Sequence, residues 1–183
     1  RLSAYEAIRQ LVARYAVAVD ARDIETLVSL FVEDVHVGSL GTRRAALRES
    51  FELSLHGIGV SILNVGTHVI DLVGQDDAKG IVYCKGEIQD GTRWIHQAIV
   101  YEDRYRKVAG AWYFTRRNHR LFYGAEVGTN PLGLPPANWP QRHDGWGTVP
   151  GEWDSWRRFW ADSTDGSATD GSGEETNPRG DST

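Results

Sequence analysis

The hydrophobic pattern of this chain changes its period once, near Val60. Before that point apolar residues recur three and four apart, which predicts amphipathic helices over 3–23, 24–31 and 43–55. After it apolar and polar residues alternate, which predicts strands over 62–73, 78–88, 93–106 and 111–123, with Asp90-Gly91 as a strong hairpin signal. A further short strand is predicted over 35–37. Helices followed by hairpin-connected strands are typical of an α+β domain, so we expect the helices on one face of a curved antiparallel sheet.

The acidic charge of the chain is concentrated at its C-terminal end. The formal net charge is -5, and residues 162–183 carry six carboxylates and one arginine, so the rest of the chain is close to neutral. A neutral body lacks the basic surface that nucleic-acid binding requires. No apolar run approaches the roughly 20 residues that span a bilayer. We therefore expect neither a nucleic-acid nor a membrane partner.

The C-terminal third differs in composition from the rest. Five of the seven tryptophans fall between residues 139 and 160. So much aromatic area is rarely left in water, so we expect an ordered arm over 126–161, ending in a short helix over 152–160. This arm would pack on the domain or on a second subunit. Residues 162–183 are rich in Gly, Ser, Thr and Asp and are predicted to be disordered. The predicted domain itself covers 1–125.

Cys84 is the only cysteine. A single thiol excludes an internal disulfide and a cysteine-based zinc site, and it suits a cytoplasmic protein. The histidines show no metal-ligand spacing, and the chain has no glycine-rich phosphate loop. We therefore predict neither a metal nor a cofactor.

Polar residues on the last predicted strand divide between its two faces. Alternation puts Arg117 and His119 on one side, and Arg116, Asn118 and Arg120 on the other. The set that points inward would bind a carboxylate or enolate oxygen of a ligand. His96 lies on a strand with apolar residues on both faces, so alternation does not decide its side, and we consider it as a second acid.

Several segments together resemble a known family. ARYAVAVDARD, IETLVSLFVEDV, NVGTHVIDL and GAWYFTRRNHRLFYG occur in the order found in the SnoaL-like branch of the NTF2-like superfamily. The resemblance covers residues 3–124. It implies an α+β cone, in which a bent antiparallel sheet wraps around the N-terminal helices and leaves a deep pocket. Scytalone dehydratase, bile-acid 7α-dehydratase and hexachlorocyclohexane dehydrochlorinase belong to this branch.

The resemblance also implies a set of site residues. The catalytic positions would be Tyr15, Asp20, His68, His96 and Arg120, and the substrate would contact Asn64, Tyr101, Arg117 and His119. Where relatives carry a strand histidine, this chain has Asn64, and His68 follows four residues later. On a regular strand Asn64 and His68 face the same side as Ile70, so His68 reaches a site placed slightly deeper in the pocket. The alternative is a β-bulge that shifts the register and brings His68 to the site.

The chemistry implied by these residues is general acid–base catalysis. A neutral imidazole is a suitable proton acceptor near pH 7, and a buried carboxylate orients it, so we expect Asp20 to support His68. The alternatives are that His68 is a core residue, that Asp20 binds backbone amides at a helix end, and that Tyr15 only packs in the core.

The function implied is a cofactor-independent lyase or isomerase of the dehydratase type, acting on a hydrophobic polycyclic or steroid-like molecule. A homo-oligomer, dimer or trimer, is expected. One alternative is a non-catalytic subunit like the β subunits of ring-hydroxylating dioxygenases. The other is an NTF2-like protein that binds a ligand without chemistry, for which Asn64 in place of the histidine is the best support.

Overall fold

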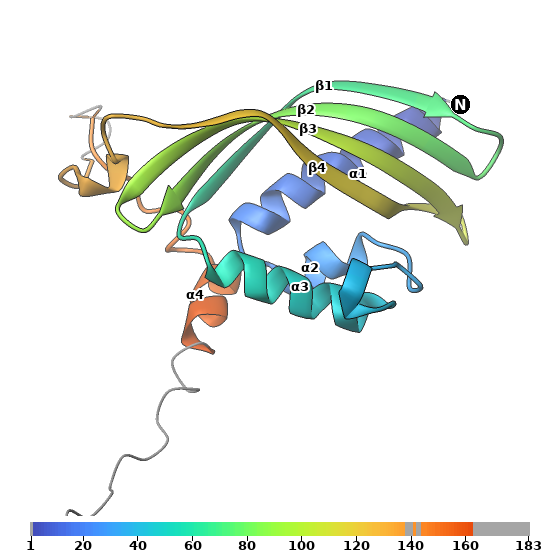
Figure 1. Ribbon diagram of the computed structural model, residues 1–183, viewed down its shortest axis with the longest axis horizontal. Coiled ribbons are helices and arrows are strands. Elements are labelled where there is room, and N and C mark those ends of the chain that lie inside the picture. Colours follow the sequence, from blue (N-terminus) through green and yellow to red (C-terminus); the bar gives the residue numbers. More distant parts are fainter. Residues whose placement is uncertain (1, 138–140, 142–143, 163–183) are drawn as a thin grey trace, which may run out of the picture.

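A computed structural model of the chain describes residues 2–137, 141 and 144–162. Its main elements are α1 (Leu2–Asp20), α2 (Ile24–Ser29), α3 (Arg44–His56), β1 (Ser61–Leu72), β2 (Asp77–Asp90), β3 (Arg93–Val108), β4 (Ala111–Glu126) and α4 (Asp154–Ala161), with short 3-10 turns η1 (Gly38–Leu40) and η2 (Pro131–Gly133). The four strands form one antiparallel sheet in chain order. The sheet arches over α1, and α2 and α3 lie on the same side (Figure 1). The α+β class with helices on one face of a curved sheet is confirmed.

The turns between elements follow local chemistry. The β3–β4 hairpin needs left-handed backbone at two consecutive positions, and Ala109 and Gly110 have φ of 49° and 88°. Asp23 caps α2 by accepting a hydrogen bond from the Thr26 amide at 3.0 Å. The predicted strand over 35–37 was wrong: that segment forms one isolated bridge, from His36 to Thr42, because no neighbouring strand extends it.

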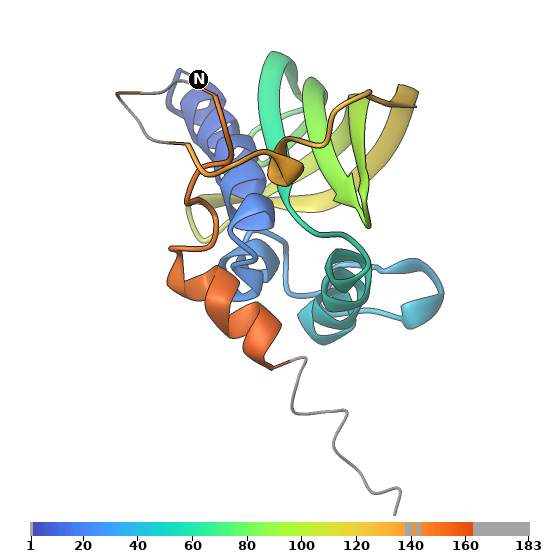
Figure 2. The ribbon, with the colours of Figure 1, turned by 90° about the vertical axis from the view of Figure 1, so that its left-hand side faces the viewer.

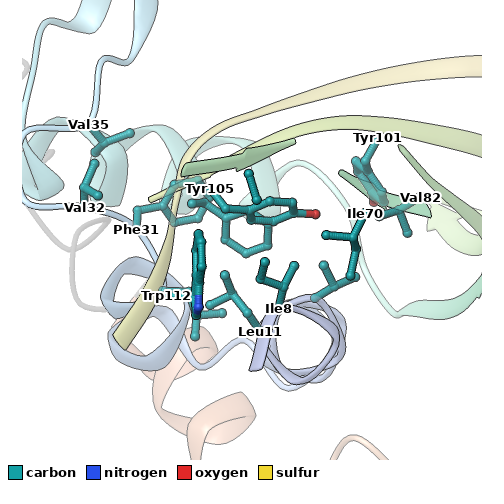
Figure 3. Packing of buried hydrophobic residues seen from close by; sticks show 14 of the residues in the cluster. Ile8, Leu11, Phe31, Val32, Val35, Ile70, Val82, Tyr101, Tyr105 and Trp112 are labelled. Carbon is teal, nitrogen blue, oxygen red and sulfur yellow. The ribbon is translucent and has the colours of Figure 1, made fainter. Parts of the chain in front are cut away.

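The core lies between α1 and the inner face of the sheet. The stripe of α1 buries Ile8, Leu11 and Val12 against strand residues such as Tyr105 and Phe114, which are 1% and 0% exposed (Figure 3). Burying each large apolar side chain stabilises the fold by about 1.5–3 kcal/mol. The buried stripe therefore fixes how α1 sits on the sheet, and with it the direction of Tyr15 and Asp20.

The C-terminal arm returns to the end of α1. Helix α4 lies beside the C-terminal part of α1, away from the sheet (Figure 2). The Ser155 hydroxyl donates to the Ala21 carbonyl at 2.7 Å, and Phe159, which is 6% exposed, stacks on His56 with 4.0 Å between ring centroids. The predicted tail after Asp162, like Trp139, lies outside the described residues.

No helix of the described residues covers the outer face of the sheet (Figure 1). Apolar side chains there are exposed, among them Val69, Ile81, Tyr83 and Phe122. Association of copies of the chain through this face stays a prediction. Within residues 2–137, 141 and 144–162, no helix combines the length and the apolar character that a membrane crossing requires.

Candidate functional site

A buried ion pair lies at the centre of the inner face. Asp103 on β3 and Arg117 on β4 are directly opposite each other in the antiparallel ladder. Arg117 donates from Nε to Asp103 Oδ1 at 2.9 Å and from Nη2 to Oδ2 at 2.6 Å, and the two side chains are 3% and 0% exposed. Such a bidentate pair holds the guanidinium in one fixed plane. The inward direction of Arg117 agrees with the predicted alternation of the last strand.

Three aromatic rings enclose this guanidinium. The centroids of Tyr15, Tyr101 and Phe114 lie 4.2, 4.2 and 4.4 Å from Arg117 Cζ, within the range of cation–π attraction. Tyr15 thus comes from α1 to the same place as two strand residues. One buried donor of the group, Arg117 Nη1, has no hydrogen-bond partner among the described residues. Because an unpaired buried N–H is costly, a ligand oxygen placed there would be bound favourably.

A chain of hydrogen bonds leads from the ion pair to His68. The Tyr105 hydroxyl donates to Asp103 Oδ2 at 2.8 Å, and His68 Nε2 lies 3.2 Å from that hydroxyl oxygen. Since the hydroxyl proton is used by Asp103, Nε2 of His68 must be the donor to Tyr105, and Nδ1 is the unprotonated nitrogen. Burial lowers the pKa of His68, although the nearby Asp103 carboxylate acts in the opposite direction. His68 is therefore a neutral imidazole at pH 7.

A β-bulge decides which side chains of β1 face inward. The register with β2 shifts between Val65 and His68, so that two residues oppose Tyr83. As a result His68 is half-buried on the inner face, whereas Asn64 is exposed on the outer one. The expectation that both share a face was wrong for Asn64, because the bulge breaks the alternation between them.

Asp20 binds the beginning of β1. Its Oδ1 accepts from the Ser61 hydroxyl at 3.0 Å and its Oδ2 from the Leu63 amide at 2.9 Å. The expected pairing of Asp20 with His68 is not formed, since each group has these other partners in the described part of the chain. Burial raises the pKa of the Asp20 carboxyl to about 6, and the two hydrogen bonds oppose this only in part.

Asp20 should therefore make the stability of the fold depend on pH. Its pKa is about 6 in the folded chain and 3.8 as a free group, so the folded state binds the proton more tightly. This contribution is fully present below about pH 4 and is lost as the pH rises through 6, by about 2 kcal/mol after allowance for partial exposure. Urea unfolding from pH 4 to 7 should show this loss in the unsubstituted chain and not in Asp20→Asn.

The exposed Asp71, which lies 3.8 Å from Lys79, offers the matched control for this measurement. Asp71→Asn should leave the fall in stability between pH 4 and 7 in place. Parallel pH profiles for the unsubstituted chain and Asp20→Asn would contradict the raised pKa.

His96 and Arg120 lie on the outer face. Arg120 donates from Nη1 to Glu102 at 2.8 Å and its side chain is exposed, and His96 Nε2 lies 3.5 Å from Glu87. Strand alternation thus places Arg120 on the side away from Arg117. The prediction that these two residues join Tyr15 in one catalytic site is therefore corrected: they are not brought together with it.

His119 and Tyr101 lie beside Arg117 on the inner face. The two are opposite each other in the ladder, and their ring centroids are 5.4 Å apart. Burial, followed by the charge of Arg117, lowers the pKa of His119. Unlike His68, His119 is exposed, and the neighbouring inward Leu121 is 48% exposed. The side chains of His119 and Leu121 are therefore accessible at this end of the inner face.

Sequence reasoning missed Asp103 and Tyr105. Both lie on the same face of β3 as the buried Tyr101, at every second position. The signal in the sequence was therefore a carboxylate on a strand face that is otherwise apolar. An arginine on the inward side of the next strand was its natural partner. No group of three or more His, Cys, Asp or Glu side chains within the described part of the chain is arranged to hold a metal ion.

A model of the SnoaL-like domain matches residues 1–118. The chain belongs to the SnoaL-like family. No curated protein matches it. The other comparisons concern solved structures and show what this SnoaL-like chain is similar to in fold.

Three solved structures illustrate that similarity. A candidate scytalone dehydratase from Novosphingobium aromaticivorans is 23% identical, with a TM-score of 0.60 over 70% of this chain and 91% of that one. The hexachlorocyclohexane dehydrochlorinase LinA-type3 from Novosphingobium barchaimii is 24% identical, with a TM-score of 0.62 over 70% and 92%. A candidate aromatic ring hydroxylase from N. aromaticivorans is 20% identical, with a TM-score of 0.61 over 69% and 95%. At these identities the likeness shows the fold alone.

Proposed function

We propose that this SnoaL-like protein is a cofactor-independent lyase or isomerase that acts on a hydrophobic small molecule at the inner face of its sheet. The observation that carries the proposal is the buried Arg117, which offers an unpaired N–H beside the accessible imidazole of His119. A dehydratase and a dehydrochlorinase are among the proteins with a similar fold, and both names describe elimination reactions.

The roles follow from the contacts of each group. His119, neutral at pH 7, accepts a proton from a carbon next to a carbonyl or a leaving group. Arg117 Nη1 donates to the oxygen that gains negative charge, and Asp103 with the three rings fixes the position of the guanidinium. In an elimination His119 gives the proton to the departing hydroxyl, which leaves as water, whereas a halide leaves as the anion. Return of the proton to a different carbon completes an isomerisation. His68 acts through Tyr105 and Asp103, as a positioning residue.

The direct test replaces His119 by glutamine. We expect a loss of at least about 100-fold in turnover, since a positioned general base contributes about 10² to 10⁴. Exchange of α-protons of bicyclic and steroid ketones in D₂O, followed by proton NMR, measures this step with model compounds in place of the natural substrate. Arg116→Gln is the matched control, because Arg116 is exposed on the opposite face of the same strand. Equal exchange by the unsubstituted chain and His119→Gln would reject the assignment.

The pH profile provides a second test. The base must be neutral, and burial and Arg117 lower the pKa of His119 below its ordinary value of 6.5. The rate should therefore rise with pH through an apparent pKa below 6.5 and be constant near pH 7. The acid limb should disappear in the residual activity of His119→Gln. An acid limb centred above 6.5 would contradict a His119 whose pKa is lowered by partial burial and by the charge of Arg117.

A ligand-binding protein without chemistry is the second candidate. It is favoured by one observation: Asp20 is bound by Ser61 and Leu63, so the expected pair of carboxylate and strand histidine is not assembled. In that case bicyclic ketones would bind with measurable heat, Arg117→Lys would weaken their binding, and no exchange of α-protons would occur. Calorimetry and the exchange experiment on the same ketones therefore distinguish the two functions.

A further inference from the structure

We propose that a groove between α1 and the beginning of β4 is a second binding site, for a flat aromatic anion. The groove has a volume of about 590 Å³, and its walls come from α1, the end of α2, the start of α3 and the β3–β4 turn. Sites for small organic ligands have volumes of roughly 300–1,000 Å³. The groove shares no lining residue with the Arg117 network, so this inference does not depend on the proposed function.

The floor of the groove is apolar and contains an unpaired donor. Leu11, Leu30 and Trp112 line it and are 6%, 7% and 8% exposed. The indole N–H of Trp112 has no hydrogen-bond partner in the described part of the chain, and its nitrogen is not among the polar atoms that are buried without a partner, so solvent reaches it. A ligand oxygen at this position would supply the missing acceptor.

The rim of the groove carries positive charge only. Arg14 and Arg44 line it, and its described lining contains no carboxylate, whereas each of four other hollows on the molecule has at least one. Arg44 is held by the Phe31 carbonyl, 2.8 Å from Nε, and by the exposed Glu33 at 3.4 Å. Arg14 is exposed and has no ion-pair partner among the described residues. Arg14 is thus available to an anion.

The aromatic lining indicates the shape of the ligand. Trp112 and Tyr113 are among the residues that line the groove, and the Arg44 guanidinium lies 5.8 Å from the centroid of Tyr113. A planar ring stacks on such surfaces with better contact than an alkyl chain does. The chemistry that fits is therefore an aromatic ring system bearing one carboxylate or sulfonate directed at Arg14.

Calorimetric titration with 8-anilinonaphthalene-1-sulfonate tests the site. Arg14→Glu should weaken binding by about tenfold, because it reverses the charge that faces the sulfonate. Arg9→Glu is the matched control on the same helix, since Arg9 is also exposed but does not line the groove. Its affinity should equal that of the unsubstituted chain. Trp112→Phe, which keeps one aromatic ring but removes the pyrrole ring with its N–H, should weaken binding severalfold.

Competition and the neutral analogue complete the test. N-phenyl-1-naphthylamine, which lacks the sulfonate, should bind equally to the unsubstituted chain and to Arg14→Glu. 2-Naphthoate should displace the sulfonate probe more readily than decanoate does. Unchanged affinity in Arg14→Glu, an equal loss in Arg9→Glu, or loss in His119→Gln instead would each overturn the groove as the site. Better displacement by decanoate would overturn the aromatic class.

Discussion

Asp103→Asn is expected to lower the free energy of unfolding by about 3–5 kcal/mol, a large part of the 5–15 kcal/mol typical of a domain. The substitution leaves Arg117 charged, buried and without a counter-ion, although the hydrogen bond from Tyr105 can remain. Urea unfolding at pH 7, followed by far-ultraviolet circular dichroism, measures the change. The predicted size follows from the exposures of 0% and 3%, since an isolated ion in the interior is far more costly than one at the surface.

Two further variants identify the cause of that loss. Glu102→Gln breaks the exposed pair with Arg120 on the neighbouring outer position and should cost less than about 1 kcal/mol. The double change Asp103→Leu with Arg117→Met removes both charges and should recover much of the stability lost in Asp103→Asn, because no unpaired ion remains. A loss below about 1 kcal/mol in Asp103→Asn would show that water reaches the pair.

Arg22→Met is expected to destabilise the fold by about 3 kcal/mol. Arg22 is 1% exposed and donates to the carbonyls of Val19 and Gly59 and to the hydroxyl of Ser61. Its guanidinium also lies 4.9 Å from the ring centroid of Trp156 in α4. Methionine keeps the alkyl part and the φ of 54° but removes three side-chain hydrogen bonds. It leaves the Gly59 carbonyl without a partner among the described residues, at a cost of about 1–3 kcal/mol, whereas the Val19 carbonyl keeps the Arg22 amide and the Ser61 hydroxyl keeps Asp20.

This substitution should also loosen α4. Because Arg22 connects the end of α1 to Trp156, trypsin should cleave at Arg157 and Arg158 faster in Arg22→Met than in the unsubstituted chain. Arg93→Gln, which removes only exposed ion pairs with Asp90 and Glu126, is the control for both measurements and should change neither by much. If Arg22→Met lost the full predicted stability but was cleaved by trypsin at the normal rate, the docking of α4 would not depend on Arg22.

The periodicity of the chain predicts much of this architecture. The elements, their order and the hairpin turns follow from local patterns, because the spacing of apolar residues directly determines which face each element buries. The same alternation separates Arg117 and His119 from Arg116, Asn118 and Arg120, as the structure confirms. For strand β4 the inward residues of the candidate site thus follow from the local pattern, without any tertiary contact.

The partners of those residues depend on contacts between distant parts of the chain. Asp103 meets Arg117 only because β3 and β4 pair in one register, and Asp20 meets Leu63 across 43 positions. The bulge between Val65 and His68 is defined by pairing with β2, and its one local trace in β1 is Gly66. Local sequence therefore determined the main helices and strands and, outside the bulge of β1, their faces. Tertiary packing decided which buried charge is neutralised by which partner, because the cost of desolvation is set by all the surroundings of a group and not by its neighbours in the chain.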